Sequence, residues 1–394
     1  MINEKMEALG SEPSEIRKLF EEAKLMKKER GEDNVFDFSI GNPSVPSPIE
    51  VKEGLIKLIQ EEDSVKLHSY TSSQGDPETR KAIAEYLNKK YDANANPDLI
   101  YLTMGASAGL AVVINALTNP GDEIIVFAPY FPEYKVISEK AGAKFIEVKT
   151  NEKFMPDIAL LDEKVSEKTK CIIIDSPNNP TGVVYPESVI KTLADYLKKK
   201  EKEYNHPIYL FSDEPYRELV YEDMKYPFIT RYYDDSIVTY SFSKSLSIPG
   251  ERFGYVLVSS KAQDKDKIYK AICGAGRALG YVCAVTLFQK LIPHVLGITS
   301  DLSIYRRNRD LLCEMLEEIG YEFSESNGAF YLFLKALEDD EKHFSEVAKE
   351  YGLFLVPSES FGIKGYVRVS YCVKESTIKN SRKAFEALFK RYRG

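Results

Sequence analysis

Seven short apolar runs follow one another through the middle of the chain. Several are apolar at consecutive positions rather than at alternating ones, which is typical of strands buried on both faces of a largely parallel sheet. Helical or loop stretches separate most of them. We therefore predict an α/β fold whose large domain holds a mostly parallel seven-stranded sheet flanked by helices, with strands at residues 99–104, 123–127, 144–148, 171–175, 208–212, 237–241 and 254–258.

The last two runs are joined by a connection too short for a crossover helix. Only a dozen residues separate residues 237–241 from residues 254–258, and they include Pro249 and Gly250. Parallel neighbours need a longer connection, so we expect the final strand to run antiparallel.

Helical periodicity dominates the two ends of the chain. Residues 14–30 are apolar at Ile16, Leu19, Phe20 and Ala23, with Ser14 as a possible cap. Near the other end we expect helices at 300–319 and 375–392 and strands at 329–334, 353–356 and 366–371. These patterns predict a large domain at residues 48–295 and a smaller α+β domain built from residues 1–47 and 296–394.

Composition narrows the class of protein. The chain has 394 residues, of which 43% are hydrophobic and 29% charged, and its net charge is -8. This is an ordinary globular composition, and the acidic balance argues against a nucleic-acid partner. No apolar run is long enough to span a membrane, and the first residues lack the apolar core of a signal peptide.

The cysteines and histidines show no metal-ligand spacing. Five scattered cysteines, without a C-x-x-C pair, are typical of reduced thiols in a cytoplasmic enzyme. The four histidines are equally dispersed, so we predict no metal site.

Lys244 is the first candidate for chemistry. It follows the predicted strand 237–241, and open α/β sheets present ligands at the carboxyl ends of their strands. An amine there can form a Schiff base with an aldehyde. A lone lysine is more often a surface residue, but Ser241, Ser243 and the forked cation of Arg252 are typical of a phosphate-binding segment.

Two further motifs follow predicted strands. Asp213-Glu214-Pro215-Tyr216 ends the run 208–212, and by itself it is best interpreted as a turn with a solvated acid. Asn178-Asn179-Pro180-Thr181-Gly182 follows the run 171–175, where the proline restricts Asn179 to an extended conformation.

Small residues follow the first strand of the predicted sheet. Gly105, Ala106 and Ser107 open an apolar helix at 108–117, whose free N–H groups and positive end favour an anion. Close packing of the helix on the sheet is the alternative explanation for these small side chains.

In this order and spacing, and with Tyr70-x4-Gly75 ahead of them, the motifs resemble those of the fold type I, class I/II aminotransferases, the aspartate aminotransferase superfamily. The resemblance covers about residues 35 to 372. It implies pyridoxal 5'-phosphate as the cofactor, bound as a Schiff base (aldimine) to Lys244, in a homodimer with shared active sites.

The resemblance also implies a role for each matching residue. Asp213 pairs with the pyridine nitrogen, Asn179 and Tyr216 reach the phenolic oxygen, and Phe131 stacks on the ring. Gly105, Ala106, Ser107, Ser241, Ser243 and Arg252 bind the phosphate, which Tyr70 reaches from the neighbouring subunit. The substrate meets Gly41, Asn42, Asn179 and Arg368, the last of which binds the α-carboxylate. The chain has Thr79-Arg80 where many relatives have Leu-Arg.

The predicted reaction is transfer of an amino group from an L-amino acid to a 2-oxo acid, aspartate- or alanine-type with 2-oxoglutarate. A β-C–S lyase on the same fold is the alternative, because fold and cofactor do not fix the reaction. A DNA-binding regulator is disfavoured, since the 47 residues before the large domain are not notably basic. A dicarboxylate needs a second cation, for which Arg277 is a candidate. The alternative for Arg277 is a structural ion-pair residue.

Overall fold

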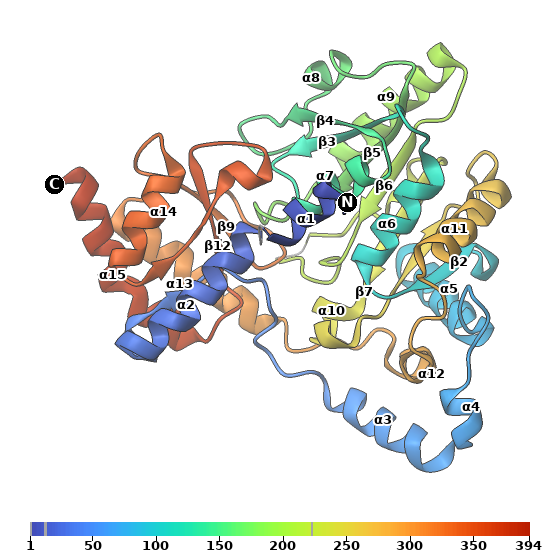
Figure 1. Cartoon of the computed structure of the whole chain (residues 1–394), viewed down its shortest axis with the longest axis horizontal. Helices are drawn as coiled ribbons and strands as arrows, with labels where there is room; N and C mark the ends of the chain where they lie inside the picture. The colour runs from blue at the N-terminus through green and yellow to red at the C-terminus, as the bar shows by residue number, and fades with distance from the viewer. Residues whose placement is uncertain (1, 12–13, 222–223) are drawn as a thin grey trace.

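The computed structural model describes residues 2–11, 14–221 and 224–394. The sheet and its helices form one part of the molecule, and the C-terminal helices and strands form another beside it (Figure 1). α2 (Glu15–Arg30) packs on the C-terminal part through Leu19 and Ala23, and α1 (Glu4–Ser11) lies between the two parts in this view. Ser14 directly precedes α2, but its side chain makes no capping hydrogen bond.

The predicted seven-stranded sheet is confirmed, with the order β2-β8-β7-β6-β5-β3-β4. β8 is antiparallel to both of its neighbours, as the short connection requires, and the other pairs are parallel. The strands are β2 (Ile100–Thr103), β3 (Glu123–Ala128), β4 (Lys144–Lys149), β5 (Thr169–Asp175), β6 (Tyr209–Asp213), β7 (Ser236–Ser241) and β8 (Gly254–Val258).

Apolar side chains leave both faces of this sheet. In β3, Ile125 and Phe127 join the core on one face, while Ile124 and Val126 join the core on the other. This alternation follows from the two-residue period of a strand. It explains why the runs are continuously apolar, because both faces are covered by helices.

Different helices cover the two faces. The first face packs against α3 (Ile49–Glu61), α5 (Pro77–Tyr91), α9 (Glu187–Tyr204) and α12 (Thr286–Val295). The second packs against α6 (Ala106–Leu117), α7 (Glu133–Lys140) and α11 (Lys265–Leu279). The short helices α4 (Ser64–His68), α8 (Ile158–Asp162) and α10 (Phe242–Ser245) complete this part.

The second part of the molecule joins the two ends of the chain. β9 (Tyr331–Lys335), β11 (Val356–Pro357) and β12 (Tyr366–Ser370) form an antiparallel sheet, and β1 (Phe36–Asp37) pairs in parallel with β10 (Leu353–Phe354). The strand predicted at 353–356 is therefore two strands, because the chain passes from one sheet to the other at Leu355. The helices are α13 (Ser303–Ile319), α14 (Glu341–Glu350) and α15 (Glu375–Arg393).

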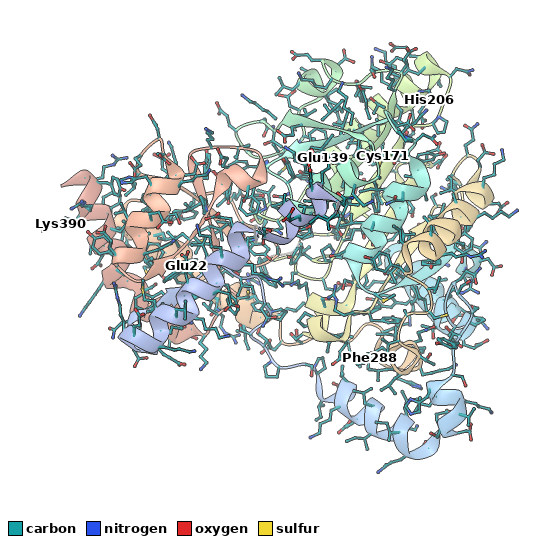
Figure 2. All side chains as sticks on the ribbon, viewed as in Figure 1. Glu22, Glu139, Cys171, His206, Phe288 and Lys390 are labelled. Carbon is teal, nitrogen blue, oxygen red and sulfur yellow. The ribbon has the colours of Figure 1, made fainter. Side chains whose placement is uncertain are left out.

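All five cysteines are free thiols, and Cys171 lies buried in β5 within the large sheet (Figure 2). In the part of the chain that the structure describes, no helix combines the length and apolar character needed to cross a membrane.

Candidate active site

A cavity of about 250 Å³ lies at the carboxyl ends of the parallel strands. Most of the residues selected from the sequence line it: Gly41, Ala106, Ser107, Phe131, Asn179, Asp213, Tyr216, Ser241, Ser243, Lys244, Arg252 and Arg368. They come from segments more than 300 residues apart in the chain. The fold therefore brings the separate motifs into one site.

Lys244 lies in the short helix α10, directly after β7. Ser241 holds the start of this helix, because its hydroxyl accepts a hydrogen bond from the Ser243 N–H. The Lys244 Nζ donates a hydrogen bond of 2.7 Å to the Gly41 carbonyl. Burial lowers the pKa of Lys244 to about 8, so a neutral, nucleophilic amine is accessible near neutral pH.

Asp213 is the last residue of β6 and is almost fully buried. Its Oδ2 accepts a 2.8 Å hydrogen bond from the Tyr134 hydroxyl, while its Oδ1 has no hydrogen-bond partner among the described residues. Burial raises the pKa of Asp213 to about 7. The interpretation of this motif as a turn with a solvated acid is wrong, because the acid faces the cavity.

Arg368 lies in β12 of the small sheet and lines the same cavity. Its Nη1 donates to the Asn179 Oδ1 at 3.0 Å, and its Nη2 donates to the Ser39 carbonyl. The side chain is buried, yet it forms no ion pair with any acid of the described residues. A buried guanidinium without a carboxylate partner is suited to a carboxylate ligand.

Tyr216 meets the small sheet through its hydroxyl. It lies 2.9 Å from the Tyr331 hydroxyl, and Tyr331 in turn stacks its ring against the Arg368 guanidinium at 4.6 Å. These contacts fix both phenols on the wall of the cavity.

The N-terminus of α6 provides the anion-binding end of the cavity. Gly105 precedes the helix at a φ of 81°, and a Cβ there would lie 2.9 Å from the Arg252 Nη2. The close approach of Arg252 to Gly105 places the guanidinium beside the free N–H groups at the start of α6. Ser241 and Ser243, whose hydroxyls lie 2.6 Å apart, line the same cavity.

Four candidate residues are absent from the cavity lining: Gly105, which directly precedes α6, and the exposed residues Asn42, Arg277 and Tyr70. Asn42 is exposed, although Gly41 beside it lines the cavity. Arg277 is exposed near the end of α11 and forms no ion pair with a described residue. Tyr70 is 93% exposed on the loop between α4 and α5.

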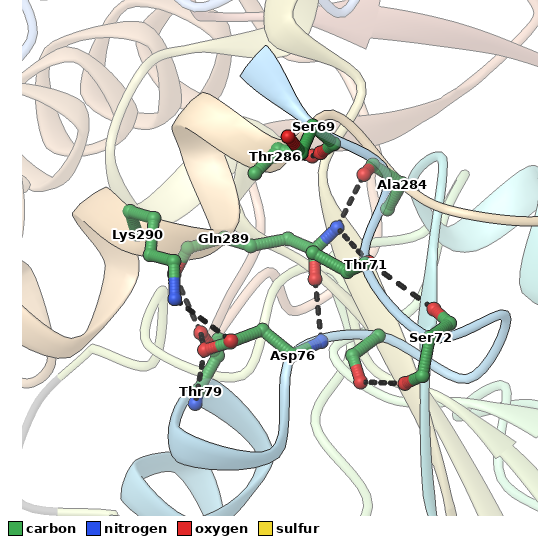
Figure 3. Close-up of polar contacts among 10 residues, drawn as sticks. Ser69, Thr71, Ser72, Asp76, Thr79, Ala284, Thr286, Gln289 and Lys290 are labelled. Carbon is green, nitrogen blue, oxygen red and sulfur yellow. Dashed lines mark hydrogen bonds and ion pairs between the residues drawn. The ribbon is translucent and has the colours of Figure 1, made fainter. Parts of the chain in front are cut away.

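The loop that carries Tyr70 is held by a buried polar cluster (Figure 3). Gln289 of α12 accepts a hydrogen bond from the Asp76 N–H at 2.6 Å and donates to the Thr71 hydroxyl at 3.1 Å. Asp76 also caps α5 and pairs with Lys290 at 2.8 Å. The Tyr70 side chain is thus exposed although the loop that carries it is held in place by these hydrogen bonds.

Several lining residues were missed from the sequence. Asp175 ends β5, Tyr331 begins β9, and Ile16 comes from α2 at the other end of the chain. For Asp175 a signal was available, because it ends a buried strand just as Asp213 does. For Ile16 and Tyr331 there was none, since only the packing of distant segments brings them to the cavity.

The arrangement fits one class of cofactor. Pyridoxal 5'-phosphate has three groups that the protein must bind. Its aldehyde reacts with an amine, its basic ring nitrogen pairs with an acid, and its phosphate binds at a helix N-terminus. The unpartnered Asp213 Oδ1 meets the need of the ring nitrogen, and the close approach of Arg252 to Gly105 meets that of the phosphate. Fold and cavity together define a fold type I pyridoxal-phosphate enzyme.

Known proteins agree with this class. The family model for aminotransferase class I and II matches residues 33–385. Aspartate aminotransferase from Thermotoga maritima is 32% identical over 365 residues, covering 91% of this chain and 92% of its own. An aminotransferase from Eubacterium rectale, solved by crystallography, is 52% identical with a TM-score of 0.98, and the similarity covers 100% of both chains. Aspartate aminotransferase from Thermus thermophilus, solved with maleate, has a TM-score of 0.85 at 26% identity, covering 98% of this chain and 99% of that one.

The chain therefore belongs to the class I and II aminotransferase family. It is a pyridoxal-phosphate-dependent transferase that moves an amino group between amino acids and 2-oxo acids.

Proposed function

We propose that this chain forms a homodimeric, cytoplasmic aminotransferase that binds pyridoxal 5'-phosphate at Lys244 and acts on aspartate or a similar L-amino acid, with 2-oxoglutarate as acceptor. One observation carries the proposal: the Lys244 amine and the unpartnered Asp213 carboxyl oxygen face the same cavity. The named relatives are aminotransferases, which favours amino transfer over the β-C–S lyase alternative.

The residues that would hold the cofactor are those around this pair. Asp213 would bind the ring nitrogen, and Asn179 and Tyr216 would bind the phenolic oxygen, with Phe131 against the ring face. Gly105, Ala106, Ser107, Ser241, Ser243 and Arg252 would hold the phosphate. When bound, the cofactor supplies an electron sink for the pair of electrons left at the substrate's α-carbon.

Lys244 and Arg368 would act on the substrate. The Arg368 fork binds the α-carboxylate, and its contact with Asn179 keeps the guanidinium at the cavity wall. Lys244, with a pKa of about 8, takes the proton from the α-carbon as general base. Gly41, whose carbonyl accepts from Lys244, would border the substrate, and Asn42 follows it on the same loop.

Exposed apolar side chains on α3, α4 and the loop after α4 support the proposed dimer. Ile56 and Ile59 of α3, Val65 of α4 and Tyr70 are all exposed. Burial of this apolar surface against a second copy would be favourable and would place Tyr70 near the partner's phosphate site.

Aspartate is proposed because of the named relatives, one of which was solved with maleate. The cations among the described lining residues are Lys244, Arg252 and Arg368. A second carboxylate would therefore need a cation from outside this lining.

We also propose that the large domain comprises residues 48–295 and that the small domain comprises residues 1–47 and 296–394. The reason is that β1 pairs with β10, and Phe36 and Phe38 join the C-terminal core.

The test compares Lys244→Ala with Lys267→Ala, which removes an exposed lysine of α11. Wild type and Lys267→Ala should show the visible absorption band of the bound cofactor, and Lys244→Ala should lack it. An undiminished band in Lys244→Ala would refute the lysine assignment. In wild type, one amino acid should yield a stoichiometric amount of keto acid; catalytic pyruvate and ammonia would instead show a lyase.

A further inference from the structure

Two buried carboxyl groups lie side by side at the carboxyl edge of the sheet. Asp175 ends β5 and Asp213 ends β6, and the two are direct partners in the parallel register. Their residues are 5% and 4% exposed, and both line the cavity. Asp213 has a role in the proposed function, whereas Asp175 has none so far.

The hydrogen bonds of Asp175 divide its two oxygens. Oδ2 accepts from the Asn179 N–H at 2.9 Å, which ties the strand end to the turn that carries the Asn179 amide. Oδ1 is buried and has no hydrogen-bond partner among the described residues. One oxygen is thus structural, and the other is left to a proton or to a ligand.

The surroundings of Asp175 disfavour a negative charge. Among the described residues, the titratable groups that interact with Asp175 are one acid and four phenols, with no cation among them: Asp213, Tyr134, Tyr185, Tyr216 and Tyr331. Burial raises the pKa of Asp175 well above its usual range, and the charge of Asp213 raises it further. Two adjacent buried carboxyl groups cannot both ionise near neutral pH.

We propose that Asp175 is a positioning residue that stays protonated, so that Asp213 carries the single negative charge of the pair while Asp175 fixes the Asn179 turn. The charge settles on Asp213 because that acid accepts from the Tyr134 hydroxyl and faces the ring nitrogen in the proposed function. This part of the inference rests on the proposed function. A cationic ring stabilises the charge on Asp213 and leaves the proton on Asp175.

Two substitutions separate the two roles of Asp175. Asp175→Asn is neutral, has nearly the same shape and keeps an oxygen for the Asn179 N–H. Asp175→Ala removes that acceptor and leaves a buried N–H unpaired. Asp195→Asn, on the exposed face of α9, controls for loss of a carboxylate elsewhere.

The first measurement reads the proton directly in the enzyme without cofactor. We expect the carbonyl stretch of a protonated carboxylic acid in the infrared spectrum at pH 8.5, where Asp213, with a pKa of about 7, is ionised. The band should be present in wild type and Asp195→Asn and absent from Asp175→Asn. Absence of this band from wild type would overturn the proposal. Because no cofactor is needed, this result is independent of the proposed function, which fails separately if wild type binds no pyridoxal 5'-phosphate.

The second measurement uses the cofactor. In Asp175→Asn, the pH at which the visible band titrates should stay at the wild-type value, since no charge has been removed. In Asp175→Ala, the affinity for pyridoxal 5'-phosphate should fall about tenfold, because the Asn179 turn loses its anchor. A downward shift of about one pH unit or more in Asp175→Asn would mean an ionised Asp175. That shift, or wild-type affinity in Asp175→Ala, would overturn the inference.

Discussion

Removal of the Arg217 guanidinium should destabilise the protein strongly, because the buried carboxylate of Glu214 would lose its ion-pair partner. Arg217 follows the Asp213 motif and pairs with Glu214 at 2.6 Å, and both side chains are 0% exposed. The guanidinium also lies 4.4 Å from the centre of the Tyr240 ring and 5.0 Å from that of Phe228. In Arg217→Met the volume is largely kept, but Glu214 loses its cation.

The size of the effect follows from the burial of the pair. Breaking a buried ion pair by removal of one partner costs about 3–5 kcal/mol, whereas replacing both partners by neutral groups is often close to neutral. We therefore expect Arg217→Met to lower the free energy of unfolding by about 3–5 kcal/mol at pH 8. The double variant Glu214→Gln/Arg217→Met should recover most of this loss.

The loss should depend on pH with a definite sign. Burial already raises the pKa of Glu214, against the opposing effect of Arg217. Without the cation, the folded protein retains the Glu214 proton to a higher pH than the unfolded chain does. Stability of Arg217→Met should therefore fall as pH rises above about 4.3, by at most about 1.4 kcal/mol per unit.

Urea unfolding followed by circular dichroism, at fixed protein concentration and at pH 5 and pH 8, measures these quantities. Lys191→Met, which breaks a surface pair with Glu187, should have no measurable effect. An Arg217→Met protein within about 1 kcal/mol of wild type at pH 8 would refute the reasoning. A double variant as unstable as the single one would refute it equally.

Three further predictions concern the cavity and the Tyr70 loop. The Lys244 amine of the cofactor-free enzyme should react with an added aldehyde at a rate that rises with pH through a midpoint of about 8. Stopped-flow absorbance measures this rate, and a midpoint near the ordinary lysine pKa of about 10.4 would contradict the burial argument. Arg368→Lys should lower kcat/KM for the amino donor about 10- to 100-fold, because an ammonium cannot bind a carboxylate with two parallel bonds. Steady-state kinetics on Arg368→Lys and on the exposed Arg277→Lys tests this prediction, and equal kcat/KM values in the two variants would count against the assignment. Gln289→Leu should lower the free energy of unfolding by about 1–3 kcal/mol, because the Asp76 N–H loses its buried acceptor; urea unfolding checks it, and an unchanged midpoint would exclude a structural role for the cluster.

Much of the large sheet could be predicted from the sequence because its strands are buried on both faces. Continuous apolar runs mark such strands, and the short link before residues 254–258 correctly predicted the antiparallel strand β8. The region at 353–356 was harder, because its apolar residues serve two different sheets. A hydrophobic pattern shows that a residue is buried but does not show which strand it pairs with.

The sequence by itself determined the local chemistry of the site. Lys244, Asp213 and Asn179 each lie at or just after a strand end, in motifs short enough to be recognised along the chain, and the structure places all three in one cavity. The turns after these strands depend largely on local residues, such as Pro180 after Asn179 and Pro215 shortly after Asp213, and such residues can be recognised along the chain.

Only the tertiary structure decided which side chains meet across the cavity. The pairing of Asp175 with Asp213 depends on which strands are neighbours and on their register. The arrival of Ile16 and Tyr331 depends on how segments at opposite ends of the chain pack together. The protonation of the buried acids depends in turn on these contacts, because the pKa of a carboxyl group is set by the charges and dipoles around it in space, which no linear pattern specifies.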